Sequence, residues 1–516
     1  MDFVGNLTLH DYIASHARAR PESRFCLSGG RWRTWGEFER RVVAGASMLA
    51  ASGVRRGDRV VVLMGNTGDC VEVMTAVQRS GAICVPCSPL YQPDEVAAVL
   101  ENCEPVLLVA DSANEATALA VADRVPGIRL VTESPRSRAT CTIGDLFTAS
   151  PAGEYRPRPD DVAVIMHTSG TTARPKGVVL THGNLLHNAT TIARAVSWRR
   201  DDVSLHFFPL QHANGGLSNL GPVLLTGAAM VLEPKFSAGR FGSLLTTHRI
   251  TFTSVNATHV KFLLNTEPTA ADAAHGCWRM QLGLTLDPRL WREFEARFAT
   301  RCLPTYGCTE SLGAVVYGSL DRDPAPGSCG RPLPGYDVTV IGEDGAELSA
   351  GETGRVRIRA TSRHGLARGY WPDQQPPAGG LVTNDRGYFD DDGHLFFTDR
   401  AGDMIKRAGF NVAPAEVERV LMEQDAVADA VVVGVPDPMR EETIVAFVVA
   451  ERAQEPPAEA ELLSALSARL ATYKVPEKVI FVEELETDAL GKVRRHTFRA
   501  RAAAALAGSA DTGALR

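Results

Sequence analysis

The chain has 516 residues, of which 44% are hydrophobic and 22% charged, so wholesale disorder is excluded and a folded globular protein is predicted. Its formal net charge is −7, from 54 basic and 61 acidic residues, which argues against a nucleic-acid binder that works by bulk positive charge. The length predicts more than one domain-sized unit.

The first 150 residues alternate helical and strand patterns. Residues 35–52, WGEFERRVVAGASMLAAS, have helical periodicity and lead to an apolar run of strand length at 57–65. The same order of helix and strand recurs over 73–87 and again over 93–111. Regular alternation of this kind predicts an α/β sheet with helices on its faces.

Later segments repeat this pattern and then depart from it. A predicted strand at 157–166 opens a second block, and residues 201–316 alternate again. From about residue 327, short strands joined by Gly and Asp turns predict a small antiparallel unit. After residue 400, a helix beginning at Pro414 and two strand-like runs predict a compact α+β segment.

We therefore predict an α/β protein of two domains. The large N-terminal domain, 1–401, contains stacked α/β subdomains and the small antiparallel β unit. A small, mobile α+β C-terminal domain follows at 402–516. The Ala-rich tail at 501–516 is expected to fray.

The N-terminus and the cysteines bear on the compartment. MDFVGNLTLHDYIASH has acidic residues where a signal peptide has basic ones, and no stretch approaches ~18 apolar residues, so neither a signal nor a transmembrane helix is expected. Ten cysteines in a chain of this length do not indicate a disulfide scaffold. Cys84 and Cys87 have the spacing of a redox or metal pair, but their flanks are apolar and we expect buried thiols. The cytoplasm is the predicted location.

A loop of small hydroxyl residues follows the strand predicted to end near Met166. Only seven of the basic residues are lysine, and one of them, Lys176, closes this loop. Small donors and one compact positive charge predict a phosphate cradle. The cradle consists of Thr168, Ser169, Gly170, Thr171, Thr172 and Lys176. Pro175 precedes the lysine and Gly177 follows it, so the loop is not a Walker A motif.

The loop and four later segments resemble the adenylate-forming superfamily, which includes acyl-CoA synthetases, adenylation domains and firefly luciferase. The later segments are PTYGCTES at 304–311, GSCGRPLPGYDV at 327–338, TNDRGYFDDDGHLFFTDRAGDMIKRAGFNVAPAEVE at 383–418 and LGKVRRH at 490–496. They occur in family order and cover essentially the whole chain. TTARPKGVVLTHGNL and DRAGDMIKRAGFNV look most like the carnitine and crotonobetaine CoA ligase branch.

The resemblance implies an acid–thiol ligase that uses ATP and Mg²⁺, with coenzyme A as co-substrate. ATP converts a carboxylate into an acyl-adenylate, and a thiol then displaces AMP. By this resemblance, Glu310 holds Mg²⁺, Thr309 touches the α-phosphate, and Lys492 stabilises charge at the α-phosphate and the carboxylate. His212 matches a family histidine near the mouth of the acid pocket.

The resemblance also assigns the nucleotide and thiol contacts. Tyr306 and its neighbours would pack on adenine, and Asp385 would accept the ribose hydroxyls with Arg400 nearby. The remaining nucleotide contacts implied are Thr305 and Gly307. Gly402 occupies the hinge position, where glycine permits large backbone rotations. Gly409 would let the thiol arm approach closely.

The acid pocket is implied at Asn256, His259, Gly283, Leu284, Thr285, Ser311 and Leu312, and adjacent glycines such as Gly215 and Gly216 suggest room for a bulky acyl group. Four departures from the family pattern are Ala173, Asn384, Gly402 at the hinge, where the family usually has Asp or Lys, and LGLT at 282–285, where the family has two glycines. Leu284 and Thr285 would reshape the pocket wall. The sequence therefore supports ATP binding more strongly than it supports turnover of both half-reactions.

Three alternatives stay open on the sequence. The acceptor could be an acyl-carrier protein or a partner enzyme instead of coenzyme A. The chain could be a non-catalytic homologue that binds an acid or a nucleotide, which the LGLT departure favours and the retained Lys492 and Glu310 oppose. A luciferase-like oxygenase shares the first half-reaction. The sequence identifies neither the acid nor the oligomeric state.

Overall fold

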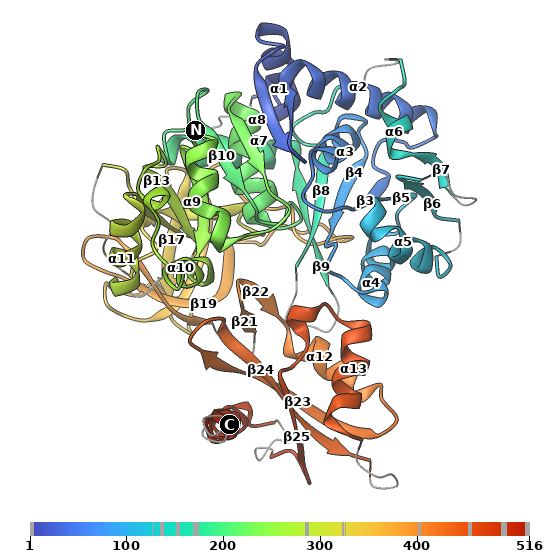
Figure 1. Ribbon diagram of the computed structural model, residues 1–516. Helices are drawn as coiled ribbons and strands as arrows, with labels where there is room; N and C mark the ends of the chain where they lie inside the picture. The colour runs from blue at the N-terminus through green and yellow to red at the C-terminus, as the bar shows by residue number, and fades with distance from the viewer. Residues whose placement is uncertain are drawn as a thin grey trace. The chain divides into compact units, whose positions relative to one another are not determined.

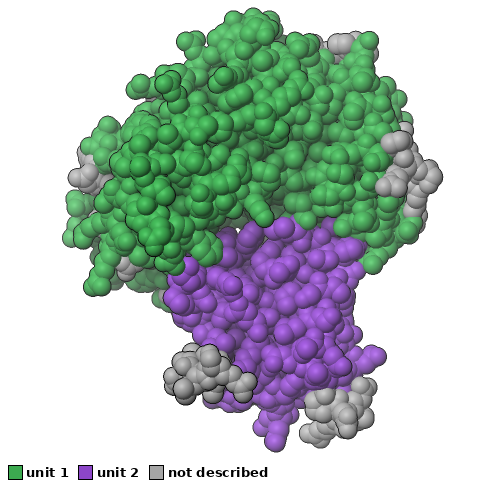
Figure 2. Space-filling view, viewed as in Figure 1, with its two compact units in different colours: residues 1–89, 99–168, 177–401 green, residues 90–98, 169–176, 402–516 purple. Residues whose placement is uncertain are grey.

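The computed structural model describes residues 5–125, 127–134, 139–150, 155–168, 175–283, 288–321, 325, 327–400, 404–451, 457–486 and 493–510. The chain forms two compact units, coloured separately in Figure 2. Unit 1 comprises residues 1–89, 99–168 and 177–401, and unit 2 comprises residues 90–98, 169–176 and 402–516. Within the described residues, no helix is both long and apolar enough to cross a membrane.

A seven-stranded sheet contains the first block of alternating elements (Figure 1). Its strands, in spatial order, are β7 (Ala139–Thr142), β6 (Arg129–Thr132), β5 (Leu107–Ala110), β3 (Arg59–Leu63), β4 (Ile83–Cys87), β8 (Val162–Thr168) and β9 (Lys176–Thr181). The helices of this block are α2 (Trp35–Ala51), α3 (Gly68–Arg79), α4 (Pro93–Cys103), α5 (Glu115–Ala122) and α6 (Ile143–Leu146). A capping box starts α2, since the Thr34 hydroxyl accepts from the Glu37 amide and the Glu37 carboxylate accepts from the Thr34 amide.

A nine-stranded sheet carries the second block. Its strands, in spatial order, are β16 (Arg331–Pro332), β15 (Gly313–Tyr317), β14 (Arg301–Cys308), β13 (Arg279–Gly283), β12 (Phe252–Asn256), β10 (Val203–His206), β11 (Ala229–Leu232), β1 (Arg24–Ser28) and β2 (Arg31–Thr34). The strands from β14 to β1 are parallel, so their carboxyl ends share one edge of the sheet. Ligands of parallel α/β sheets bind at such an edge.

Helices cover both faces of this sheet. One face packs against the larger hydrophobic core with α1 (Leu9–Ala19), α7 (His182–Ala195) and α8 (Leu220–Thr226). The other face packs in a second core with α9 (Ala238–Thr247), α10 (Ala257–Leu264) and α11 (Pro288–Phe298). A π-helix, η2 (Ala213–Asn219), leads into α8, and short 3₁₀ turns lie at η1 (Ser112–Asn114) and η3 (Ala270–Asp272).

A four-stranded antiparallel sheet completes unit 1. Its strands are β17 (Tyr336–Ile341), β18 (Gly354–Ala360), β19 (Leu381–Phe389) and β20 (Leu395–Arg400). The sheet confirms the predicted antiparallel unit, and its residues Val338, Val356 and Leu395 join the larger core.

Unit 2 contains a mixed sheet with helices. Its strands are β21 (Ile405–Arg407), β22 (Phe410–Val412), β23 (Val427–Asp437), β24 (Glu441–Ala450) and β25 (Lys478–Val482). Its helices are α12 (Pro414–Met422), α13 (Glu459–Arg469), η4 (Thr472–Lys474) and α14 (Arg495–Ala510). The prediction that a helix begins at Pro414 is confirmed, because proline occupies the first turn of α12.

The expectation of a frayed Ala-rich tail is wrong as far as Ala510, which ends helix α14. Alanine has the highest helix propensity, and Phe498 and Ala502 are buried against β23 and β24. Arg495 adds an ion pair, in which its Nη2 donates to Glu418 Oε2 at 2.9 Å. Packing and charge pairing therefore hold a segment that composition alone suggested was loose.

Candidate active site

The segment after β14 forms a tight turn that presents Thr309 and Glu310. The buried Ser311 hydroxyl accepts from the Cys308 amide at 2.9 Å and donates to the Gly313 carbonyl at 3.0 Å, which closes the turn. Leu312 follows in the left-handed region at φ 67°, and its carbonyl accepts from Asn188 Nδ2 at 2.6 Å. Bulky residues rarely adopt this backbone region, so the surrounding contacts hold the turn in place.

Close backbone approach explains the glycine before this turn. A Cβ on Gly307 would lie 1.8 Å from the Gly313 carbonyl oxygen, so no side chain fits there. The pairing of β14 with β15 also shifts register between Tyr306 and Gly307, which is a β-bulge. Bulges often re-aim side chains beside functional sites.

Tyr306 and Asp385 lie together although 79 residues separate them. The Tyr306 hydroxyl donates to Asp385 Oδ2 at 3.0 Å and lies 3.2 Å from Thr383 Oγ1. Both Tyr306 and Asp385 are buried. Burial and then the Asp385 charge raise the pKa of Tyr306 well above its ordinary value, so the phenol stays neutral and remains a donor. In the strand register, Asp385 lies directly opposite Arg400, as predicted for the pair.

Glu310 has a neighbour that the sequence did not reveal. The Tyr370 hydroxyl donates to Glu310 Oε1 at 2.8 Å. Burial and then the Glu310 charge raise the pKa of Tyr370, so this phenol is a neutral donor too. No local pattern links the two residues, because 60 positions separate them.

The predicted acid-binding residues collect at the carboxyl edge of the nine-stranded sheet. Asn256 lies beside Gly283 in the register, and Gly283 lies beside Thr305. Asn256 also caps α10, since its Oδ1 accepts from the His259 amide at 2.9 Å. His259 packs among Phe207, Phe208 and Phe236, and burial lowers its pKa to about 3, so the ring is neutral.

His212 directly precedes the π-helix η2, a feature that the sequence analysis missed. Its amide donates to the Pro209 carbonyl at 3.1 Å, and its own carbonyl accepts from the Gly216 amide at 2.8 Å. Cβ atoms on Gly215 and Gly216 would lie 2.3 Å from the Pro209 and Leu210 carbonyl oxygens. These glycines therefore permit close backbone contact, and the expectation that they make room for a bulky acyl group stays a prediction.

Gly409, the glycine predicted to let the thiol arm approach, lies in unit 2, at a two-residue turn between β21 and β22. Ala408 and Gly409 both have positive φ, at 51° and 83°. The Gly409 amide donates to Glu441 Oε2 at 3.0 Å, and the Ala408 amide donates to the Arg440 carbonyl at 2.8 Å.

Several predicted residues lie outside the described part of the chain, and their roles stay predictions. They are Ser169, Gly170, Thr171 and Thr172 of the phosphate loop, Ala173, Leu284, Thr285, Gly402 and Lys492. The strands on either side of the phosphate loop are described. Thr168 ends β8 and Lys176 begins β9, so the loop joins two neighbouring strands and not a strand and a helix.

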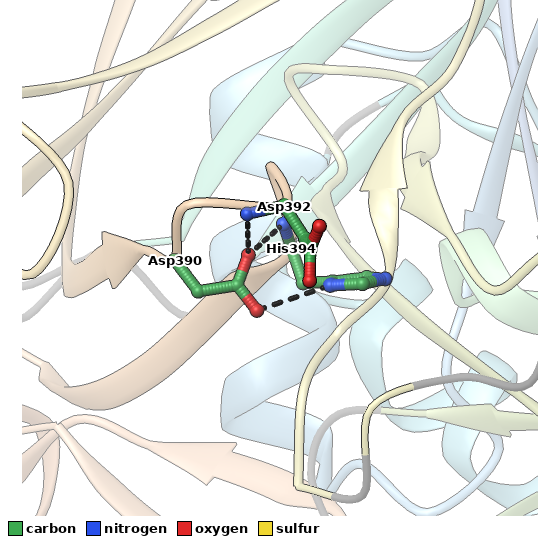
Figure 3. A group of neighbouring side chains, drawn as sticks. All are labelled: Asp390, Asp392 and His394. Atoms are coloured by element: carbon green, nitrogen blue, oxygen red, sulfur yellow. Dashed lines mark hydrogen bonds and ion pairs between the residues drawn. The ribbon is translucent and has the colours of Figure 1, made fainter.

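Asp390, Asp392 and His394 form the one cluster of potential metal ligands found among the described residues (Figure 3). His394 Nδ1 lies 3.1 Å from Asp390 Oδ2, and its Nε2 accepts from Arg331 Nε at 3.2 Å. The Asp390 carboxylate also accepts from the backbone amides of Asp392 and His394. The cluster thus closes the turn between β19 and β20, and both ring nitrogens are already engaged.

A large α/β unit followed by a small α+β unit is the architecture expected of an adenylate-forming enzyme, and comparisons with known families support that class. The family model for AMP-binding enzymes matches residues 13–371, and the model for the AMP-binding enzyme C-terminal domain matches residues 416–492. The chain therefore belongs to the AMP-binding enzyme family. The predicted superfamily, fold class and enzyme class, an AMP-forming acid–thiol ligase, are confirmed.

Relatives span nearly the whole chain. Sulfoacetate–CoA ligase of Cupriavidus necator is 32% identical over 500 residues, covering 95% of this chain and 96% of that protein. Crotonobetaine/carnitine–CoA ligase of Salmonella enteritidis is 29% identical over 473 residues, covering 87% and 89%. The structure of an amide bond synthetase from Marinactinospora thermotolerans matches with a TM-score of 0.85 and 26% identity, covering 96% of this chain and 99% of that one.

Proposed function

We propose that this enzyme ligates a small carboxylic acid to coenzyme A at the expense of ATP. A carboxylate oxygen attacks the α-phosphorus of ATP, pyrophosphate leaves, and an acyl-adenylate forms. The coenzyme A thiolate then attacks the acyl carbon, and AMP leaves with the electron pair of the broken C–O bond. The observation that carries the proposal is the convergence of Tyr306, Asp385 and Arg400, predicted from separate segments, at one place in unit 1.

The residue roles follow from this arrangement. Asp385, held by the Tyr306 hydroxyl, accepts the ribose hydroxyls, and Tyr306 packs on adenine. The phosphate loop, from Thr168 to Lys176, binds the leaving pyrophosphate, because small donors and a lysine suit phosphate oxygens. Lys492 stabilises the negative charge that develops at the α-phosphorus and the carboxylate.

Glu310 suits a magnesium ion, and Thr309 suits the α-phosphate. A carboxylate is an oxygen donor that Mg²⁺ prefers, a hydroxyl can donate to a phosphate oxygen, and both side chains occur on one tight turn. Bound there, the ion would neutralise charge on crowded phosphate oxygens. Tyr370, which donates to Glu310, orients the carboxylate.

Coenzyme A is the proposed acceptor because curated relatives that span most of the chain are CoA ligases. An amide bond synthetase shares the fold at 26% identity, so an amine or an acyl-carrier protein is the second candidate. We place the reaction in the cytoplasm, since all ten cysteines are thiols outside any disulfide, as expected of a reducing compartment.

The direct test measures pyrophosphate release from Mg-ATP across a panel of carboxylic acids, with and without coenzyme A. We expect acid-dependent release, and an acyl-CoA product when coenzyme A is present. Release without acyl-CoA would redirect the proposal to another acceptor. ATP binding without release for any acid would favour the non-catalytic homologue.

A further inference from the structure

Three polar side chains lie side by side beneath the predicted acid site. Neighbours in a parallel register point to the same face of a sheet. Ser254 lies beside Gln281, and because Leu205 lies beside Thr253, the next residue, His206, lies beside Ser254. His206, Ser254 and Gln281 are here termed the polar row.

The polar row is buried just below the carboxyl edge of the sheet. His206, Ser254 and Gln281 are 3%, 1% and 2% exposed. Gln281 precedes Gly283 by two residues on the same face, a separation of about 7 Å. Because Gly283 has no side chain, nothing on this strand covers Gln281. Asn214 of η2 faces the same place, since its Nδ2 would lie 4.0 Å from a Cβ on Gly283.

Ser254 and Gln281 of the polar row form side-chain hydrogen bonds, whereas the ring of His206 forms none among the described residues. Ser254 Oγ donates to Asn219 Oδ1 at 2.8 Å, and Gln281 Oε1 accepts from the Tyr317 hydroxyl at 2.7 Å. Both ring nitrogens of His206, in contrast, are buried without a partner among the described residues. An unpaired buried polar group costs about 1–3 kcal/mol, so His206 calls for a partner that the described residues do not supply.

The row and its partners carry no formal charge. Burial lowers the pKa of His206 to about 3, so the imidazole is neutral at physiological pH. Burial also raises the pKa of Tyr317, which keeps that phenol neutral. The buried Arg279, two residues before Gln281 on the same strand, is already paired with Asp202 at 2.8 Å. A charged group placed beside the row would therefore lose its hydration without gaining an unpaired opposite charge among the described residues, whereas a neutral hydrogen-bonding group would find donors and acceptors.

We propose that the polar row selects a carboxylic acid whose far end carries an uncharged hydrogen-bonding group, such as a hydroxyl or an amide. This inference rests on the proposed function, because it assumes that the acid enters at Gly283. It separates this enzyme from relatives named for sulfoacetate and crotonobetaine, whose acids carry charged ends.

The test measures dissociation constants for stable acyl-sulfamoyl adenosine analogues of the adenylate, in matched pairs. The pairs are 4-hydroxybenzoyl with 4-methylbenzoyl and 6-hydroxyhexanoyl with heptanoyl, which differ only in a hydroxyl or a methyl group. We expect the hydroxyl member of at least one pair to bind roughly tenfold or more tightly. Equal or weaker binding by the hydroxyl member of both pairs would overturn the inference and leave the proposed function intact. Binding of no analogue would contradict both.

A matched pair of serine variants locates the effect. The selectivity ratio is the dissociation constant of the methyl analogue divided by that of its hydroxyl partner. Ser254→Ala should bring this ratio near one while the methyl analogue still binds. Ser204→Ala is the control, because Ser204 lies on the same face of β10 but two residues farther from the carboxyl end of the strand than His206. This variant should preserve the selectivity ratio. Equal loss in both variants would contradict the assignment. If Ser254→Ala fails to fold, the double variant Gln281→Leu with Tyr317→Phe removes both ends of one hydrogen bond and serves instead.

Discussion

Tyr306 shows how one side chain can link the segments of the proposed nucleotide site. Its strand, β14, ends in the turn that carries Thr309 and Glu310, and its hydroxyl reaches Asp385 on β19. Since the raised pKa of Tyr306 keeps the phenol protonated, it can always donate to the carboxylate. The hydrogen bond therefore orients Asp385 and couples the nine-stranded sheet to the antiparallel sheet.

Tyr306→Phe should weaken ATP binding without abolishing catalysis. The variant leaves the buried Asp385 carboxylate one donor short, at a cost of about 1–3 kcal/mol. We expect KM for ATP to rise roughly tenfold and the free energy of unfolding to fall by about 1 kcal/mol. Pyrophosphate-release kinetics and urea denaturation measure the two effects.

Tyr336→Phe is the matched control for that variant. The buried Tyr336 hydroxyl lies in the same unit and donates at 3.0 Å to the Gly365 carbonyl, which is not part of the proposed nucleotide site. A similar loss of stability with an unchanged KM for ATP is expected. An equal rise in KM in both variants would show that Tyr306 acts through general stability alone.

Buried histidines should make the protein less stable in mild acid. Burial lowers the pKa of His259 to about 3, below the ordinary 6.5. The unfolded chain then binds a proton that the folded chain refuses, so stability is complete above pH 6.5 and is lost as the pH falls toward 3. At pH 5 this one residue costs about 2 kcal/mol.

His259→Phe should reduce that pH dependence. Phenylalanine suits the surrounding Phe207, Phe208 and Phe236 and cannot be protonated. Urea denaturation at pH 7 and pH 5 gives the loss of stability on acidification for each protein. We expect a loss smaller by about 2 kcal/mol in the variant; an identical loss would mean that His259 is not held neutral in the folded protein.

The antiparallel pairing of β14 with β15 at the bulge depends on Gly307. A Cβ on Gly307 would overlap the Gly313 carbonyl oxygen, and backbone on both sides limits relaxation. Gly307→Ala should therefore part the strands at the bulge, reduce stability by roughly 2–4 kcal/mol and abolish adenylation. Thermal unfolding with pyrophosphate release measures both.

Gly283→Ala provides the contrast at the end of the neighbouring strand. Among the described residues, a Cβ there would meet nothing closer than the Val255 carbonyl oxygen at 3.7 Å, an ordinary contact. The melting temperature should stay near that of the wild type, although acid preference changes if the acid enters at this residue. Equal destabilisation by both alanines would contradict the packing argument.

Local patterns predicted most of the elements but not their contacts. Amphipathic helices such as α2 and apolar strands such as β3 are determined by nearby residues, so periodicity found them. The π-helix η2 depends instead on how closely the carbonyls of Pro209 and Leu210 approach its glycines. The Tyr370–Glu310 bond and the polar row likewise join residues that are distant in sequence, and only the folded chain brings them together.

Across the whole molecule, the predicted chemistry divides between two parts of the chain. Lys492→Ala should slow adenylate formation by roughly a hundredfold or more, because it removes a charge proposed to stabilise the reacting phosphate. Thioester formation from a preformed acyl-adenylate should be largely retained. Lys478→Ala, which removes a lysine at the start of β25, is the control and should leave both half-reactions intact. Equal loss of both half-reactions in Lys492→Ala would contradict its assigned role.

The predicted hinge at Gly402 links the two half-reactions. If the C-terminal domain adopts one arrangement for adenylation and another for thioester formation, a residue at the pivot must change its backbone dihedrals. Proline fixes φ near −65°, so Gly402→Pro should permit one half-reaction and block the other, lowering overall acyl-CoA formation roughly tenfold or more. Gly402→Ala keeps φ adjustable and should retain both. Single-turnover assays of pyrophosphate release, and of acyl-CoA from preformed adenylate, separate the steps. Unchanged overall turnover in the proline variant would remove Gly402 as the pivot and direct the search to its neighbours.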